Sequence, residues 1–183
     1  MARTHSNSRG FTLVELMAVV AIIGILSVLA VVGYGRIIRA SHTSEATQMV
    51  GTIKTAQEAY HAEVGTYLSI SGNLDTDYCP THPAGPPTYA TWNPACGTGA
   101  DGPWSKLPVS SNGAVLFGYA TLAGLAGATM PMPSNMLDTP VPPTTTADWY
   151  VVAAKGDMDG NGTFCTVVIT SLGRTPYIDQ EGE

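Results

Sequence analysis

An unbroken apolar run near the N-terminus constrains the fold of this chain more than any other feature. The run extends from Phe11 to Val32, and Glu15 is its one charged residue. At a rise of about 1.5 Å per residue, a helix of this length crosses a hydrocarbon core of about 30 Å. We therefore expect residues 11–33 to form a membrane-spanning helix.

A carboxylate inside an apolar span is costly, so Glu15 is a candidate functional residue. The alternative is a plain membrane anchor in which Glu15 extends to the membrane surface. The charge lies five residues into the run, after a short basic segment that ends in Gly10. A plain anchor does not account for that placement.

Residues 9–16, with the sequence RGFTLVEL, resemble the processing motif of type IV prepilins and related pseudopilins. The resemblance implies that a prepilin peptidase cuts after Gly10, that the new N-terminal Phe11 is N-methylated, and that Glu15 guides assembly. It also implies that residues 1–10 are a leader peptide similar to those of the type IVa class. The similarity is close as far as about Tyr34 and weaker along the rest of the helix.

The charge and the cysteine content limit which compartment and which partners the chain is expected to have. The formal net charge is −6, and removal of the two arginines in residues 1–10 lowers it to −8. An acidic chain without a basic run is a poor candidate for nonspecific nucleic-acid binding, so no nucleic-acid partner is expected. Three cysteines, all after residue 78, fit an oxidising compartment. Basic residues before the span favour a cytoplasmic N-terminus and therefore a periplasmic head.

The helix is expected to continue beyond the membrane as an amphipathic segment over residues 34–65. Apolar or small residues recur there at spacings of three and four, which predicts one buried stripe that packs under a sheet. Gly65 is a candidate helix-ending glycine. The predicted stripe contains Ala46, Met49, Ile53, Ala56, Tyr60 and Val64, with Tyr67 just beyond.

One position departs from the family pattern. Type IVa major pilins usually carry proline where this chain has Val32, and a proline there would kink the helix. Gly33 and Gly35 are expected to loosen the helix instead, at about 1 kcal/mol each relative to alanine. Minor pilins and pseudopilins tolerate this departure, so the resemblance leaves the choice among these kinds open.

Residues 66–183 are expected to form a β-rich globular head. Residues 66–106 are rich in turn-forming residues, which predicts a folded surface loop. β-branched and aromatic residues dominate four later segments. Residues 156–162, rich in Asp and Gly, connect the second of these to the third, which predicts an antiparallel hairpin. The expected strands are residues 114–120, 149–154, 163–170 and 177–178.

The three cysteines allow three single-disulfide pairings. A bond between Cys79 and Cys96 closes a short loop and would stabilise the head by about 3 kcal/mol. We therefore favour this pairing slightly over the other two. In the related family the disulfide often joins a loop to the sheet, which makes a bond to Cys165 a serious alternative.

The segment Asp157-Met-Asp159-Gly-Asn161-Gly162 resembles the first half of a calcium-binding loop. The acidic residue that closes such a loop is missing, because its position falls near Val168. Asp, Asn and Gly also favour tight turns. The sequence therefore favours a hairpin turn without a cofactor, with weak calcium binding by Asp157, Asp159 and Asn161 as the alternative.

The sequence predicts an α+β, pilin-like fold in which a long N-terminal helix packs its second half on a small antiparallel sheet. It contains no G-x-S-x-G, Walker loop or Cys/His triad motif, so we expect a structural protein and no enzyme. The resemblance implies a type IV pilus-like filament, homo-oligomeric or of mixed pilins, with roles in adhesion and motility. Its partners would be the prepilin peptidase, the inner membrane and the pilus assembly platform. The alternatives are a pseudopilin of type II secretion and a membrane-anchored periplasmic binding domain.

Overall fold

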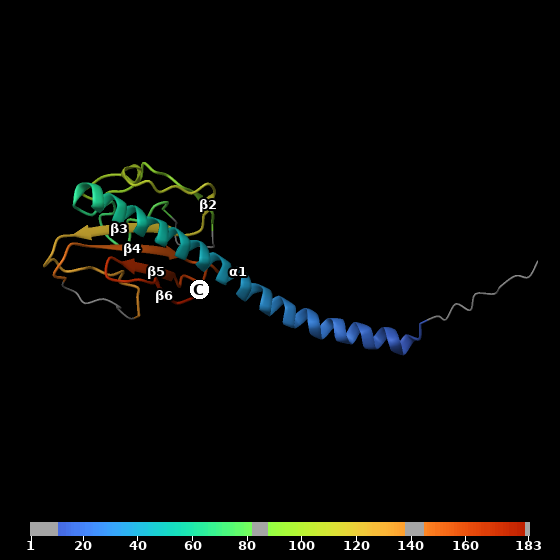
Figure 1. Ribbon diagram of the computed structural model, residues 1–183. Helices are drawn as coiled ribbons and strands as arrows, with labels where there is room; N and C mark the ends of the chain where they lie inside the picture. The colour runs from blue at the N-terminus through green and yellow to red at the C-terminus, as the bar shows by residue number, and fades with distance from the viewer. Residues whose placement is uncertain (1–10, 82–87, 138–144, 182–183) are drawn as a thin grey trace, which may run out of the picture. The chain divides into compact units, whose positions relative to one another are not determined.

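The computed structural model describes residues 11–81, 88–137 and 145–181 (Figure 1). A single long helix, α1 (Leu13–Val64), precedes all the strands, which confirms the predicted α+β fold. A short 3-10 helix, η1, lies in the loop region before the main sheet. The remaining elements are β1 (Ala90–Thr91), η1 (Trp104–Lys106), β2 (Ala114–Val115), β3 (Gly118–Gly124), β4 (Trp149–Gly156), β5 (Cys165–Thr170) and β6 (Tyr177–Asp179).

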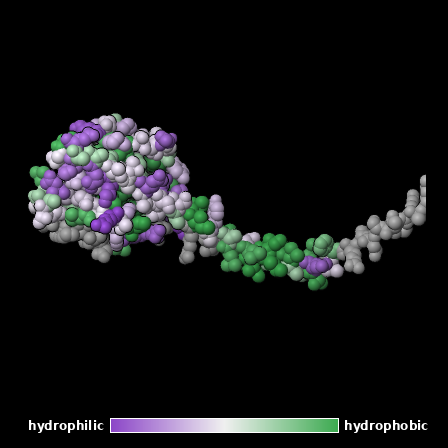
Figure 2. Space-filling view, in the orientation of Figure 1, coloured by the Kyte–Doolittle hydropathy of each residue, from purple (hydrophilic) through white to green (hydrophobic). Residues whose placement is uncertain are grey.

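The chain divides into two compact units, residues 1–38 and residues 39–183. In the first unit, every described side chain from residue 11 to residue 31 is exposed, although almost all of them are apolar. By length and composition, α1 contains a segment able to cross a membrane, and none of that segment is buried in the structure. Figure 2 shows this contrast, with apolar surface gathered on the N-terminal helical segment and mixed surface on the head.

The head is built on an antiparallel sheet with the strand order β3-β4-β5-β6. β4 and β5 pair from Val151 opposite Thr170 to Gly156 opposite Cys165, so the predicted hairpin is confirmed. The pairing of β5 with β6 confirms the short last strand. Compared with the predicted strands, β4 extends two residues further, and β5 begins two residues later because residues 163–164 belong to the turn.

Both faces of the sheet are buried. Alternate residues of β4, including Tyr150 and Val152, belong to the core cluster formed with α1. The intervening residues, including Trp149 and Val151, pack against Leu74 and other side chains from the loops on the far side. The head therefore has three layers: helix, sheet and loops.

The predicted stripe of α1 is mostly correct. Ala46 and Ile53 are fully buried under the sheet, which confirms the three-and-four spacing. Val64 is an exception, because it is 55% exposed in the last helical turn. Gly65 ends the helix as predicted, with φ at 86° and its N–H donating to the carbonyl of His61 at 2.8 Å.

The prediction of one strand over residues 114–120 is wrong. Its first two residues form β2 and pair with β1, whereas Gly118 begins β3 and pairs with β4. Between them the backbone N–H of Leu116 donates to the carboxylate of Glu45 on α1 at 3.1 Å. The backbone changes its pairing partner here, from β1 to β4. The apolar pattern therefore runs through residues 114–120 although they belong to two strands.

Candidate functional site

The start of α1 is held by reciprocal hydrogen bonds between Thr12 and Glu15. The N–H of Glu15 donates to Thr12 Oγ1, and the N–H of Thr12 donates to Glu15 Oε2, each at 3.2 Å. The Thr12 hydroxyl also donates to Oε2 at 3.2 Å. With α1 beginning at Leu13, this is a capping box with Thr12 as the N-cap and Glu15 as the third helical residue.

The capping box fixes the direction of the Glu15 carboxylate. A negative charge in the first helical turn interacts favourably with the helix dipole. Oε2 accepts both bonds from Thr12, while Oε1 accepts none from the described residues. One carboxylate oxygen of Glu15 is thus oriented by its own helix and has the capacity to accept a donor from elsewhere.

Apolar side chains surround this carboxylate along the helix. Phe11 is 81% exposed, and the large apolar side chains that follow it as far as Val31 are all about half exposed or more. The hydroxyl of Ser27, further along this stretch, donates to the carbonyl of Ile23 at 2.7 Å. The polar side chains Thr12, Glu15 and Ser27 therefore all have local hydrogen-bond partners, and Glu15 is the one among them that carries a charge.

Sequence reasoning named Gly10, Phe11 and Glu15 as site residues but missed Thr12. Phe11 directly precedes the N-cap Thr12, Glu15 is the third residue of α1, and Gly10 lies outside the described residues. The signal for Thr12 was present, because Thr-x-x-Glu directly before an apolar run is the sequence pattern of a capping box.

Comparison with known proteins identifies this N-terminal segment. Residues 5–31 match the family model of the prokaryotic N-terminal methylation motif. The chain therefore carries a type IV prepilin-like N-terminus, and this motif with its apolar helix fits a type IV pilin-like protein. Such proteins are structural subunits rather than enzymes and begin as membrane-anchored precursors. No curated protein and no solved structure matches the chain.

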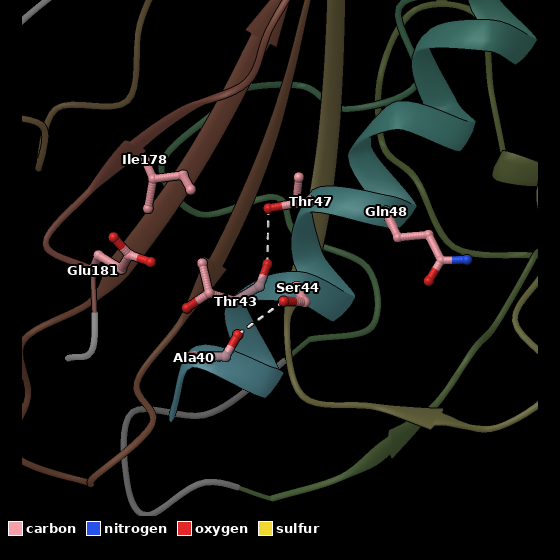
Figure 3. A pocket seen from close by; sticks show the side chains of 7 residues that line it. All are labelled: Ala40, Thr43, Ser44, Thr47, Gln48, Ile178 and Glu181. Atoms are coloured by element: carbon pink, nitrogen blue, oxygen red, sulfur yellow. Dashed lines mark hydrogen bonds between the residues drawn. The ribbon is translucent and has the colours of Figure 1, made fainter. Parts of the chain in front are cut away.

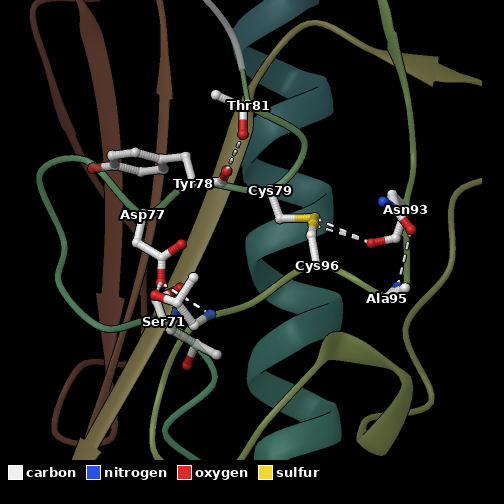
Figure 4. The surroundings of a disulfide bond; sticks show 10 residues. Ser71, Asp77, Tyr78, Cys79, Thr81, Asn93, Ala95 and Cys96 are labelled. Atoms are coloured by element: carbon white, nitrogen blue, oxygen red, sulfur yellow. Dashed lines mark hydrogen bonds between the residues drawn. A yellow bond between two sulfur atoms is a disulfide. The ribbon is translucent and has the colours of Figure 1, made fainter.

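A disulfide joins Cys79 to Cys96, with Cα atoms 6.2 Å apart (Figure 4). Cys79 also pairs through its backbone with Tyr119 of β3, by two N–H···O bonds of 2.9 Å. The disulfide therefore ties the loop around Cys96 to the edge of the main sheet. Cys165 lies outside this disulfide, fully buried in β5 beneath α1.

The loop between β4 and β5 directs its carboxylates to its own backbone. The two oxygens of Asp157 accept the N–H groups of Gly160 and Gly162 at 2.8 and 2.9 Å. Both glycines have positive φ, which the turn requires. Among the residues that the structure describes, no group of three or more His, Cys, Asp or Glu side chains is placed to hold a metal ion. The Asp157 carboxylate therefore serves the backbone of the turn.

The tip of the same loop is organised around Asn161. Its Nδ2 donates to Asp159 Oδ2 at 3.0 Å, and its Oδ1 accepts the N–H of Thr163 at 2.6 Å. The N–H of Asn161 donates to Asp159 Oδ1 at 3.1 Å. Asn161 and its two neighbouring glycines are exposed, so an ordered amide is presented at the surface of the head.

A groove of about 290 Å³ lies between α1 and the β6 end of the head (Figure 3). The hydroxyl of Thr47 in this groove donates to the carbonyl of Thr43 at 2.8 Å, and that of Ser44 donates to Ala40 at 3.0 Å. These hydroxyls already have partners within the helix. Among the described residues that line the groove, Glu181 is the one titratable side chain.

Proposed function

We propose that this chain is a structural subunit of a type IV pilus-like surface filament. It is cleaved between Gly10 and Phe11, N-methylated at Phe11, and assembled through its apolar helix. The observation that carries the proposal is the exposed apolar surface of residues 11–31 together with the capped carboxylate of Glu15 at its start.

The exposed apolar surface requires a cover. Each large apolar side chain moved from water into an apolar environment contributes about 1.5–3 kcal/mol. The segment from Phe11 to Val31 carries many such side chains. The segment is therefore stable either in a bilayer, as in the precursor, or packed against the same segment of other subunits. A filament core provides the second environment.

Glu15 gives this packing a register. Cleavage creates a cationic α-amine on Phe11, and N-methylation preserves that charge. An unpaired ion in an apolar environment costs several kcal/mol, so pairing offsets that cost. In the filament the Glu15 carboxylate pairs with the Phe11 amine of a neighbouring subunit. The rival is a pair with the amine of its own chain.

The N-terminus tests the proposal directly. Mass spectrometry of sheared surface filaments should find a chain that begins with N-methylated Phe11. Substitution of Gly10 by a larger residue should leave the uncut precursor in the membrane. A surface protein that still begins at Met1 would contradict the proposal. An anchored binding domain that never polymerises would yield no filament fraction and no N-methyl-Phe.

A pseudopilin of type II secretion is the second candidate. Val32 favours it, because this residue stands where major pilins of the related class usually carry proline. Both candidates require the same cleavage and methylation, so the N-terminus does not separate them. Long extracellular filaments favour the pilus subunit, and short periplasmic assemblies favour the pseudopilin.

A further inference from the structure

The exposed tip of the β4–β5 hairpin carries an acceptor motif that filament assembly does not use. Asn161-Gly162-Thr163 is the one Asn-x-Ser/Thr triplet in the sequence, and its middle residue is not proline. This triplet is the acceptor of N-glycosylation on exported proteins. Asn112-Gly113-Ala114 is a second exposed Asn-Gly segment, and it lacks the hydroxyl residue.

The geometry of the triplet suits attack by an amide nitrogen. The amide of Asn161 donates to the carboxylate of Asp159, which orients Nδ2. The N–H of Thr163 donates to Oδ1 of Asn161. That bond stabilises the negative charge that develops on Oδ1 when the amide loses its proton.

The position of the loop also suits a bulky modification. Residues 159–162 are exposed at the tip of a hairpin, whose base is fixed by the pairing of Gly156 with Cys165. A substituent on the Asn161 side chain would lie in the exposed loop, beyond the last paired residues of β4 and β5, so the fold would not have to open. A head on the outer side of the membrane would meet the lipid-linked sugars that such a reaction requires.

We propose that Asn161 is an N-glycosylation site. Its Nδ2 forms a bond to the anomeric carbon of a saccharide linked to polyprenyl pyrophosphate, in a reaction catalysed by a membrane-bound oligosaccharyltransferase. The bond from that carbon to the pyrophosphate oxygen breaks, and the electron pair leaves with the pyrophosphate. The amide proton passes to a carboxylate of the transferase, and nothing is oxidised or reduced. Asp159 is a positioning residue that orients the amide before transfer.

The test uses the full chain, purified from membranes and from filaments of the cells that naturally produce it. Trypsin should release residues 156–174, since cleavage follows Lys155 and Arg174, and this peptide contains Asn161. Tandem mass spectrometry should find it with an added saccharide mass and sugar fragment ions. The same peptide can be analysed from the membrane-bound precursor and from the filament. The result therefore does not depend on the proposed assembly.

Four variants sharpen the test. Asn161→Gln should abolish the modification, while Thr163→Ser should retain it because the hydroxyl remains. Asp159→Asn should lower the fraction of modified peptide without changing the melting temperature. Asn112→Gln is the matched control and should change nothing. An unmodified wild-type peptide, or one altered by deamidation alone, would overturn the proposal. So would a modification that survives Asn161→Gln.

Discussion

Gln57 of α1 forms two hydrogen bonds with the backbone of Leu68, beyond the end of the helix. Its Nε2 donates to the carbonyl of Leu68 at 2.7 Å, and its Oε1 accepts the N–H of the same residue at 3.0 Å. Nε2 also donates to the hydroxyl of Thr121 in β3 at 3.0 Å. This fully buried amide therefore joins the helix, the chain that follows it and the sheet.

We predict that Gln57→Met destabilises the head by about 2–4 kcal/mol. Methionine keeps the size of the side chain but leaves both backbone groups of Leu68 buried without partners. Thermal or denaturant unfolding would measure the loss. Gln48→Met, on the exposed side of the same helix, is the control and should stay within about 0.5 kcal/mol of wild type. Equal effects of the two substitutions would show that Gln57 does not act as a link.

Alkaline pH should destabilise the head through its buried tyrosines. Burial raises the pKa of Tyr150 above 10.0, and the Glu58 carboxylate that accepts its hydroxyl at 2.7 Å raises it further. Burial also raises the pKa of Tyr119, with the Glu45 charge as the second cause. The folded state holds these two hydroxyl protons more tightly than the unfolded state does. The protonated tyrosines therefore stabilise the head fully below the ordinary tyrosine pKa, and this stabilisation is lost as the pH rises above that pKa.

Melting temperatures measured between pH 8 and pH 11 would check this. The curve should be flat at the lower values and should fall above pH 10. The Tyr150→Phe variant should have a lower melting temperature at neutral pH, because it lacks the bond to Glu58, and a shallower alkaline decline. A wild-type curve that stays flat to pH 11 would contradict the account.

Loss of the disulfide should cost about 3 kcal/mol of unfolding free energy, given a sequence separation of 17. A double Cys79→Ser, Cys96→Ser variant measures it against wild type under non-reducing conditions. Cys165→Ala is the control, and it should leave the disulfide intact while creating only a small cavity. Peptide mapping that finds Cys165 in a disulfide would refute the assignment.

Calcium should change the melting temperature little. Both oxygens of Asp157 already accept backbone N–H groups, and the loop has no closing acidic residue at Val168. Melting curves with calcium and with a chelator should coincide. A rise of several degrees with calcium, absent from Asp157→Ala, would contradict this expectation and strengthen the pseudopilin candidate.

Much of the fold follows from periodic patterns along the chain. The three-and-four spacing around Ile53 predicts the buried face of α1, and Gly65 marks its end because it is free to adopt positive φ. The turn residues between β4 and β5 predict their hairpin. These features depend on short-range physics, which a sequence displays directly.

Features set by tertiary contacts were not predictable in the same way. Gln57 is polar and gives no sign in the sequence that Leu68 and Thr121 will satisfy it in the core. Nothing in residues 114–120 shows that Glu45 will bind Leu116 and divide the strand. At the candidate site the motif alone identified Glu15, whereas the role of Thr12 required the geometry of the helix start.

Besides capping the helix start, Glu15 is proposed to guide assembly through its charge, and substitutions can separate these two roles. Glu15→Gln keeps a capping side chain, because glutamine also serves at this position, but it removes the charge. Thr12→Val removes the capping hydroxyl and keeps the charge, at a cost of about 1 kcal/mol to the start of the helix. Glu15→Ala removes both roles. All three should remain substrates of the peptidase, because Gly10 and Phe11 are unchanged.

The most direct test counts each variant in sheared filaments relative to its membrane pool, beside wild type. An unpaired buried amine costs about 3–5 kcal/mol, so Glu15→Gln and Glu15→Ala should both enter filaments at least about tenfold less than wild type. Thr12→Val should enter at close to the wild-type level. Incorporation of cleaved Glu15→Gln equal to wild type would contradict the account, because the charge of Glu15 would then have no part in assembly.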